Sequence, residues 1–484
     1  MREKLATLPL AELKALAKAQ HIKGCSAMKK NDLIEALCNA SSSDSSSGQP
    51  AEKSENTEKP GKKRSGKKAE KQQDAEEASA QKTEKKSAEA EESSTEKNFK
   101  EEYSDKEELD SGIVAHGILE VMADGYGFIR CENYLPGEND VYVAPSQIRR
   151  FGLRTGDIIT GNTRVKTGNE KFSALLFVKS INGLSPNEAG KRYNFEDMTP
   201  IFPNERIHLE PGNNNLAMRI MDLISPVGKG QRGMIVSPPK AGKTTLLKAV
   251  AKAVTSANPE IHLIILLIDE RPEEVTDMKE SIRGENVEII YSTFDELPEH
   301  HKRVSEMVIE RARRLVEQRE DVMILLDSIT RLSRAYNLTV PPSGRTLSGG
   351  LDPAALHMPK RFFGAARNMR EGGSLTILAT ALVDTGSKMD DVVYEEFKGT
   401  GNMEMVLNRK LQEKRVFPAI DLAKSSTRRE DLLLSPEELE AMDHIRKALN
   451  ALKPEEAVDK LLDLFQRTRN NREFVDMVKK IRFY

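Results

Sequence analysis

Apolar residues recur at helical spacing near the start of the chain. Leu10, Leu13, Leu16 and Ala17 follow this period, and a second helical stretch, KKNDLIEALCNA, comes shortly after them. Residues 1–40 are therefore predicted to form a small helical unit.

The helical pattern gives way to a polar tract. Residues 41–108 contain no Val, Ile, Leu or Met and consist mainly of Ser, Ala, Lys and Glu. Such a segment cannot bury enough apolar surface to offset the entropy that it would lose on ordering. We therefore expect residues 41–110 to be a disordered, charged, low-complexity insertion. Its composition is compatible with a solvated spacer and with an auxiliary RNA-binding or condensate-forming segment.

Short β-type runs follow the polar tract. They are GIVAHGILEVM, GYGFIRC, NDVYVAP, GDIITGNTRV and KFSALLFVKSI, and Gly, Asn and Pro separate them. Five short strands within residues 111–185 predict a small closed barrel of the OB type.

Beyond a connector at residues 186–214, the apolar runs become longer. The strands GMIVSPP, HLIILLIDE, DVMILLDSI and SLTILATALV alternate with charged amphipathic helices. Continuous apolar strands are buried on both faces, as in a parallel α/β sheet. The tail opens at Ser435, followed by Pro436 and Glu438, which predicts a capped helix. Residues 215–484 are thus expected to form an α/β domain with a helical tail.

Overall composition excludes several classes of protein. The formal net charge is −2, so no gross basic excess marks a nucleic-acid partner. Cys25, Cys38 and Cys131 form no CxxC pair and leave an odd count, which argues against a disulfide framework or a zinc site. No apolar run is long enough to span a bilayer, and the first residues are not a signal peptide. We expect a cytoplasmic protein with no membrane partner.

The stretch SPPKAGKTT has the spacing of a Walker A loop between a buried strand and a helix. Ser237 stands where the first glycine of such loops is usual. Backbone N–H groups at the start of the helix would bind phosphates, Lys243 would neutralise the β- and γ-phosphates, and Thr244 would coordinate Mg²⁺. The loop residues that we expect to bind ATP are Lys240, Ala241, Gly242, Lys243, Thr244 and Thr245.

Two apolar strands end in carboxylates that complete this prediction. VMILLDS ends in Asp327, the expected Walker B residue, which would hold Mg²⁺ together with Thr244. HLIILLIDE ends in Glu270, which is placed to activate the attacking water, with Asp269 as its rival. Arg271 follows and is expected to contact the nucleotide. The pattern predicts hydrolysis.

Aromatic and charged residues alternate in the predicted barrel. In DGYGFIR, Tyr126, Phe128 and Arg130 fall on one face of a strand, which suits stacking of single-stranded bases beside a cation. Acidic residues beside aromatic ones would accept hydrogen bonds from a cytosine amino group and favour pyrimidines. Arg149, Arg150 and Arg154 would contact phosphates. The expected primary RNA-binding residues are Gly125, Tyr126, Gly127, Phe128, Ile129, Arg130, Asp140, Val141, Tyr142, Glu170, Lys171 and Phe172.

These features occur in the order found in bacterial transcription termination factors of the Rho family, which the chain resembles outside residues 41–110. The resemblance is carried by PPKAGKTTLL, LLIDERPEEVTDM, LLDSITRLSRAYN, PKRFFGAARNMREGGSLTILATALVDTGSKMDDVVYEEFKGTGNMEM and EKRVFPAIDLAKSSTRREDLL. It implies a RecA-like P-loop ATPase core. It also accounts for Ser237 and the two prolines after it, since the loops of this family tolerate a small residue there.

The resemblance implies further site residues. Rho is a ring-shaped hexamer with nucleotide between subunits, so Arg428 is expected to act as an arginine finger in the neighbouring site. Arg415 matches a second arginine at the γ-phosphate, and Phe417 matches the platform that stacks on adenine. A turn before the nucleotide strand is also implied to bind ATP: Gly228, Lys229, Gly230, Gln231, Arg232 and Gly233.

Two loops are implied to line a central pore as the secondary RNA site. Lys388, at the tip of one loop, would grip a phosphate or a 2′-hydroxyl. The other loop is rich in small residues that let a backbone approach RNA, and its members are Thr346, Leu347, Ser348, Gly349 and Gly350.

The resemblance implies an RNA-dependent ATPase and 5′–3′ translocase that binds nascent RNA and dissociates RNA polymerase. Two alternatives stay open at this point: a rotary or export ATPase subunit, which shares the core and a β-barrel, and an RNA-binding protein without ATPase activity. The chain departs from the family at Lys171–Phe172–Ser173, where members commonly carry Tyr-Phe, and in the insertion at 41–110.

Overall fold

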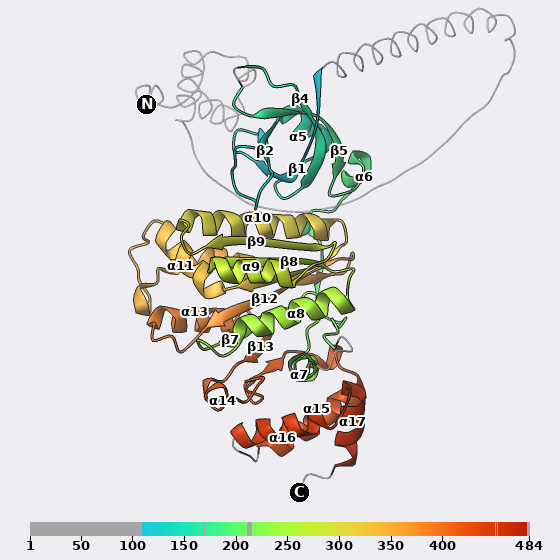
Figure 1. The fold of residues 1–484 in the computed structure, drawn as a ribbon, viewed down its shortest axis with the longest axis vertical. Helices are drawn as coiled ribbons and strands as arrows, with labels where there is room; N and C mark the ends of the chain where they lie inside the picture. Colours follow the sequence, from blue (N-terminus) through green and yellow to red (C-terminus); the bar gives the residue numbers. More distant parts are fainter. Residues whose placement is uncertain (1–108, 169, 211–214, 451, 453, 482–484) are drawn as a thin grey trace, which may run out of the picture. The chain divides into compact units, whose positions relative to one another are not determined.

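The computed structural model describes residues 109–484 apart from 169, 211–214, 451, 453 and 482–484 (Figure 1). The predicted helical unit and nearly all of the predicted disordered insertion lie outside the described residues. The described chain forms a closed barrel, a connector and a larger sheet with helices.

Five strands form the closed barrel, as predicted, and they pair in the order β1-β2-β3-β5-β4. Leu119, Ile129, Val143, Ile159 and Ile181 are at most 1% exposed and fill its interior. The elements are β1 (Asp110–Val121), β2 (Gly127–Arg130), β3 (Val141–Val143), α5 (Pro145–Phe151), β4 (Ile158–Arg164) and β5 (Ser173–Ile181).

The connector holds short elements only. They are α6 (Pro186–Ala189), a 3₁₀ turn (Phe195–Asp197) and β6 (Pro200–Ile201). β6 pairs with β11 (Arg367–Met369), which in turn pairs with β12 of the main sheet. The connector is thereby attached to the edge of the α/β domain.

The main sheet has the order β14-β13-β7-β12-β10-β8-β9, and its central strands are parallel. The strands are β7 (Arg232–Ser237), β8 (His262–Glu270), β9 (Val287–Thr293), β10 (Asp321–Asp327), β12 (Ser374–Leu382), β13 (Met403–Val406) and β14 (Ser426–Thr427). The helices among them are α7 (Leu216–Ile224), α8 (Lys243–Ala257), α9 (Pro272–Ser281), α10 (Pro298–Glu317), α11 (Ile329–Thr339), α12 (His357–Gly364), α13 (Lys388–Lys398) and α14 (Arg409–Glu413).

Neighbouring residues of these strands face two different cores. Ile235 and Leu263 pack into one apolar cluster, whereas Met234 and Ile264 pack into the other. Burial on both faces explains why the strands are apolar without interruption. Because the strands are parallel, the carboxyl ends of β7, β8, β10 and β12 meet at one edge, where ligands of open α/β sheets bind.

The C-terminal helices α15 (Pro436–Asn450), α16 (Pro454–Gln466) and α17 (Asn471–Lys480) gather around α7 (Figure 1). The predicted cap of α15 is confirmed: the Glu438 amide donates to Ser435 Oγ at 3.2 Å, and the Ser435 amide donates to Glu438 Oε2 at 2.8 Å. Arg219 of α7 is 1% exposed and donates to the carbonyls of Phe465, Thr468 and Asn470. No helix among the described residues is long and apolar enough to cross a membrane.

Candidate nucleotide site and RNA-binding face

The predicted phosphate loop joins the carboxyl end of β7 to the start of α8. Lys240 and Gly242 both have positive φ angles, 65° and 91°, so the loop turns sharply before the helix. Ser237 is fully buried, and its hydroxyl donates to the Pro238 carbonyl at 2.9 Å. Ser237 therefore ends the strand, and a small side chain is what its buried position requires.

The side chains of three predicted site residues meet at this edge of the sheet. The Lys243 ammonium forms an ion pair with Asp327 and lies 3.6 Å from Glu270 Oε2. Thr380 of β12 holds the Asp327 carboxylate by donating to its Oδ1 at 2.8 Å. The Thr244 hydroxyl donates to Glu274 Oε2 at 3.0 Å. Sequence reasoning missed Thr380 and Glu274.

Glu270 and its predicted rival Asp269 lie in different environments. The Glu270 side chain is 4% exposed, and its Oε2 atom is buried without a hydrogen-bond partner, whereas Asp269 is 39% exposed. Burial, and then the negative charge of Asp327, raise the pKa of Glu270. A carboxylate oxygen that accepts no hydrogen bond from the protein is suited to accept a proton from water.

Arg331 is a further cation at this site that sequence reasoning missed. Its guanidinium lies 3.7 Å from Glu270 Oε1 and 3.8 Å from Asp269 Oδ2. The sequence feature that could have revealed Arg331 is its place in the first turn of the helix that follows Asp327. Arg331 also borders a cavity of about 370 Å³, whose other lining residues are Asp269, Arg271, Phe294, Arg334, Leu382 and Asp390.

Other predicted nucleotide contacts come from exposed segments. Arg271 is the exposed N-cap residue of α9, directly after Glu270. Arg415 and Phe417 follow α14, where Phe417 is 52% exposed. Among the described residues, no hydrogen bond or ion pair joins Arg415 or Phe417 to the phosphate loop.

Arg428 lies at the opposite end of β7 from the phosphate loop. The Arg428 amide donates to the Asn402 carbonyl, and the Asn402 amide donates to the carbonyl of Arg232, the first residue of β7. β7 ends at Ser237. At roughly 3.3 Å per residue, this end of the strand lies about 17 Å from Arg232. The predicted ATP-binding turn at 228–233 lies at the same far end. These residues therefore do not line the phosphate loop of their own chain.

A cavity of about 250 Å³ at this far end gathers three arginines. Its lining includes Arg232, Arg367 and Arg428, and none of them forms an ion pair with a carboxylate of the described chain. Burial lowers the pKa of Arg232, and the charges of Arg367 and Arg428 lower it further. Three cations without a carboxylate form a site suited to an anion. Sequence reasoning missed Arg367.

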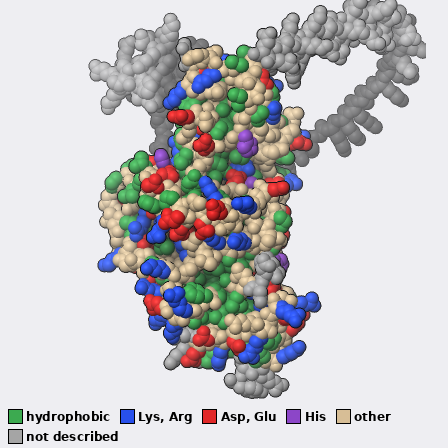
Figure 2. Space-filling view, viewed as in Figure 1, with side chains coloured by type: hydrophobic (Ala, Val, Ile, Leu, Met, Phe, Trp, Pro, Cys, Tyr) green, Lys and Arg blue, Asp and Glu red, His purple; other side chains and the backbone are tan. Residues whose placement is uncertain are grey.

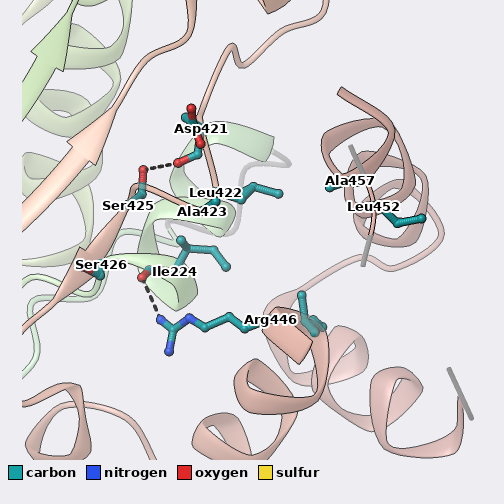
Figure 3. Close-up of a pocket in the computed structure, with 10 residues that line it drawn as sticks. Ile224, Asp421, Leu422, Ala423, Ser425, Ser426, Arg446, Leu452 and Ala457 are labelled. Carbon is teal, nitrogen blue, oxygen red and sulfur yellow. Dashed lines mark hydrogen bonds between the residues drawn. The ribbon is translucent and has the colours of Figure 1, made fainter. Parts of the chain in front are cut away.

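The segment before Arg428 is fixed beside another cavity, of about 540 Å³ (Figure 3). Ser425 accepts a hydrogen bond from the Val406 amide and donates to the Asp421 carbonyl at 2.7 Å. Arg446 donates to the Ile224 carbonyl on another wall of the cavity. The described residues that line this cavity include none of the predicted nucleotide ligands.

Four aromatic rings form a cluster on the barrel, as the sequence predicted for a stacking surface. Tyr126 lies 5.8 Å from both Phe128 and Tyr142, and Phe172 lies 5.1 Å from Phe128, measured between ring centroids. Lys171 lies over the Phe172 ring at 5.2 Å. The four aromatic side chains are half-buried, so part of each ring faces solvent.

Several residues that the sequence predicted to contact RNA are instead buried or paired within the barrel. Arg130 is 6% exposed and forms ion pairs with Glu120 and Asp140, so its charge is neutralised inside the barrel wall. Ile129 and Val141 are 0% and 5% exposed and belong to the barrel core, because alternate residues of a strand face inward.

The predicted carboxylates of this surface also have protein partners. Asp140 additionally accepts from the Gly137 amide at 2.9 Å, and Glu170 is paired with Arg164. Of the arginines expected at phosphates, Arg149 and Arg150 are exposed in the last turn of α5, but Arg154 pairs with Glu317.

The two predicted pore segments lie against each other. A Cβ atom on Gly349 would approach the Met389 amide nitrogen to 2.4 Å, and Gly349 has a φ of 79°, so only glycine fits this contact. Lys388 is exposed, but it is the first residue of α13 and not the tip of a loop. Thr346, Ser348 and Gly350 are exposed, and Leu347 is half-buried.

Positive and negative side chains are mixed on the face that Figure 2 shows. Lys and Arg side chains are interspersed there with Asp and Glu side chains. On this face, charge alone does not single out a binding surface.

Comparison with known proteins identifies three domains. The RNA-binding domain of Rho termination factor matches residues 115–187, and the N-terminal domain of Rho termination factor matches residues 4–43. The nucleotide-binding domain of the ATP synthase alpha/beta family matches residues 217–427.

Full-length relatives agree with these matches. The transcription termination factor Rho of Pseudomonas aeruginosa is 57% identical over 373 residues, which cover 76% of this chain and 88% of that protein. Rho of Bacillus subtilis is 55% identical over 374 residues, which cover 77% and 86%. This chain belongs to the Rho family.

As a Rho factor, the chain acts in transcription termination and combines an RNA-binding domain with an ATPase domain. A solved ATPase of a type III secretion system shares the fold at 19% identity, with a TM-score of 0.50 over 66% of this chain and 94% of that one. That likeness concerns the fold alone. The match of the barrel to the Rho RNA-binding domain separates the chain from the rotary and export ATPases considered above. The ATPase domain excludes the other alternative, an RNA-binding protein without ATPase activity.

Proposed function

We propose that the chain assembles into a homohexameric ring that hydrolyses ATP to move 5′ to 3′ along nascent single-stranded RNA and to dissociate RNA polymerase. The position of Arg428 carries this proposal. Arg428 and the phosphate loop lie at opposite ends of β7, so one chain cannot bring both to the same γ-phosphate. A ring of identical chains would place Arg428 of one chain at the nucleotide of the next.

The proposed chemistry divides among residues of two chains. Lys243 neutralises the β- and γ-phosphates, and Glu270 accepts a proton from the attacking water through its unpartnered Oε2. Arg428 of the neighbouring chain stabilises the charge that develops on the transferred phosphoryl group. In this proposal the same phosphates are also faced, from the neighbouring chain, by Arg232, Arg367 and the turn at 228–233. Arg415 reaches the γ-phosphate, and Phe417 stacks on adenine.

The residues at the sheet edge fit a magnesium ion. Mg²⁺ prefers oxygen ligands and keeps several waters, so it needs few protein ligands. Thr244 and Asp327 supply a hydroxyl and a carboxylate near the lysine. Among the described residues, no cluster of three or more His, Cys, Asp or Glu side chains is suited to hold a metal. When bound with ATP, the ion would neutralise phosphate charge.

RNA would contact the chain at two places. The aromatic cluster on the barrel would anchor the strand by stacking, and Lys388 with the segment 346–350 would contact it at the pore. The contact between Gly349 and α13 supports a shared surface for these two segments.

Transcription in vitro on a terminator template tests the proposed function. We expect shortened transcripts released from polymerase only when both the protein and ATP are present. Native mass spectrometry of the same preparation should show a hexamer. A hexamer that hydrolyses ATP without releasing transcripts would contradict the proposed action on polymerase.

A further inference from the structure

Glu120 of β1 is held between two arginines from different domains. Its Oε2 atom lies 2.7 Å from both Nε and an Nη atom of Arg130, which belongs to the next strand of the barrel. Arg303 of α10, in the ATPase domain, contacts the same carboxylate at 2.6 Å to Oε1 and 2.7 Å to Oε2. One oxygen of Glu120 thus contacts two nitrogens of Arg130, and one nitrogen of Arg303 contacts both oxygens of Glu120, so the carboxylate is held from two sides by charge-assisted contacts.

Arg130 is also the cation of the aromatic cluster. Its guanidinium carbon lies 4.9 Å from the centre of the Phe128 ring, and its remaining Nη atom lies 2.5 Å from Asp140. Since Arg130 and Asp140 are 6% and 2% exposed, the arrangement is set by protein contacts and not by solvent. Glu120 and Asp140 together hold the Arg130 guanidinium beside the Phe128 ring.

The charges of the network balance only when Arg303 is present. Arg130 and Arg303 carry two positive charges, and Glu120 and Asp140 carry two negative charges. Without Arg303, two carboxylates share one guanidinium, and Glu120 loses the partner that holds its Oε1 atom. A residue of the ATPase domain is thus tied to the RNA-binding surface of the barrel.

We propose that Glu120 and Arg303 are positioning residues of the primary RNA site: Arg303 holds Glu120, and Glu120 fixes Arg130 against Phe128. This inference rests on the proposed binding of RNA to the aromatic cluster. It implies that the ATPase domain, through Arg303, sets the affinity of the barrel for single-stranded RNA.

Arg303→Gln and Glu120→Gln in the full chain test the inference by fluorescence anisotropy with a short oligo(C) strand, without ATP. We expect each substitution to weaken binding about fivefold or more, the size of effect typical of a lost charge-assisted contact. The double variant should be no weaker than Glu120→Gln, since both changes break one network. Arg303→Lys should restore part of the affinity, which a general loss of folding would not allow.

Tyr134→Phe is the matched control. It removes another side-chain contact between the barrel and the ATPase domain, the hydrogen bond from the Tyr134 hydroxyl to Glu288 of β9, and does not touch Arg130. Its RNA affinity should stay within about twofold of the parent protein, because the two contacts share no partner. Equal losses in Tyr134→Phe and Arg303→Gln would overturn the inference in favour of a general effect of domain docking.

Phe128→Ala separates this inference from the proposed RNA site itself. If Phe128→Ala weakens binding and Arg303→Gln does not, the positioning role is wrong and the RNA site stands. If Phe128→Ala leaves binding unchanged, the aromatic cluster is not the primary site and both proposals fail.

Discussion

At the scale of single residues, Glu270 and Asp269 differ in the property that matters for a general base. Both end the same strand, but Glu270 is buried beside Lys243 with one oxygen that has no hydrogen-bond partner, whereas Asp269 is more exposed and lines a cavity. Arg331 contacts both carboxylates weakly and can orient either one. Burial therefore favours Glu270 over Asp269 as the proposed general base, a choice that spacing along the chain left open.

Glu270→Gln should retain ATP binding and lose most turnover. The substitution keeps Lys243, Thr244 and Asp327, whereas loss of a general base costs roughly 10²–10⁴ in rate. RNA-stimulated phosphate release and nucleotide binding measure the two properties. Asp269→Asn is the control and should keep turnover within a few-fold. The opposite ranking would move the role of base to Asp269.

The pH dependence of turnover should report the raised pKa of Glu270. A base must be ionised, so kcat should fall, as pH decreases, at a pH above the ordinary glutamate pKa of about 4.5. The folded state favours the protonated form, so the ionised carboxylate lowers stability at neutral pH, and this cost disappears as pH falls. Glu270→Gln should therefore show an equal or higher Tm than the parent protein at neutral pH. A lower Tm would contradict this sign.

At the scale of elements, the two predicted RNA surfaces belong to different structural units. The aromatic cluster is formed by β2, β3 and the residues directly before β2 and β5, within one barrel. The pore segments come from the 3₁₀ turn Ser348–Gly350 and the start of α13. Because they share no side-chain contacts, changes in one surface should leave the other intact.

Tyr126→Ala with Phe128→Ala should weaken anchoring of long single strands, by about 1–3 kcal/mol for each lost base stack. Hydrolysis stimulated by short RNA should survive in that variant. Lys388→Ala should keep anchoring and lose the stimulation. Filter binding and ATPase assays on the same preparations distinguish the two effects, and loss of the same function in both variants would exclude two separate sites.

The sequence predicted most of the elements because their patterns are local. Alternating runs predicted the barrel, continuous apolar runs predicted the sheet, and Ser435 with Glu438 predicted a helix cap. Arg130 could not be placed from the alternation of its strand alone, since its burial depends on Glu120 and Asp140, which strand pairing in the barrel brings beside it. Arg331, Thr380 and Arg367 were missed for the same reason: their partners are set by sheet order.

At the scale of the whole molecule, the proposed nucleotide site is divided between two ends of one sheet. The phosphate loop, Glu270 and Asp327 lie at one edge of the sheet, and Arg428 lies with Arg232 and Arg367 at the other. In the proposed ring, each half is completed by a second copy of the chain. On this proposal, activity should depend on assembly.

Mixing two inactive variants tests this shared site. Arg428→Ala keeps its own Walker residues, and Lys243→Ala keeps its own finger, so some interfaces in a mixed ring pair intact partners. A small ATPase activity should reappear on mixing. Single-turnover hydrolysis in rings confirmed as mixed by native mass spectrometry measures it without requiring turnover around the whole ring. Intact interfaces that fail to cleave ATP would show that Arg428 is not the finger.

The hydrogen bond from Thr380 to Asp327 has one more consequence. Thr380 lies near the end of β12, and the chain continues from it directly to Lys388. A single short stretch of backbone thus connects the carboxylate at the nucleotide with the lysine proposed to contact RNA. By thermodynamic linkage, the factor by which RNA at Lys388 tightens nucleotide binding is also the factor by which nucleotide tightens RNA binding. Titrating each ligand in the presence of the other should return one coupling constant, and Thr380→Val should reduce it in both directions by the same amount.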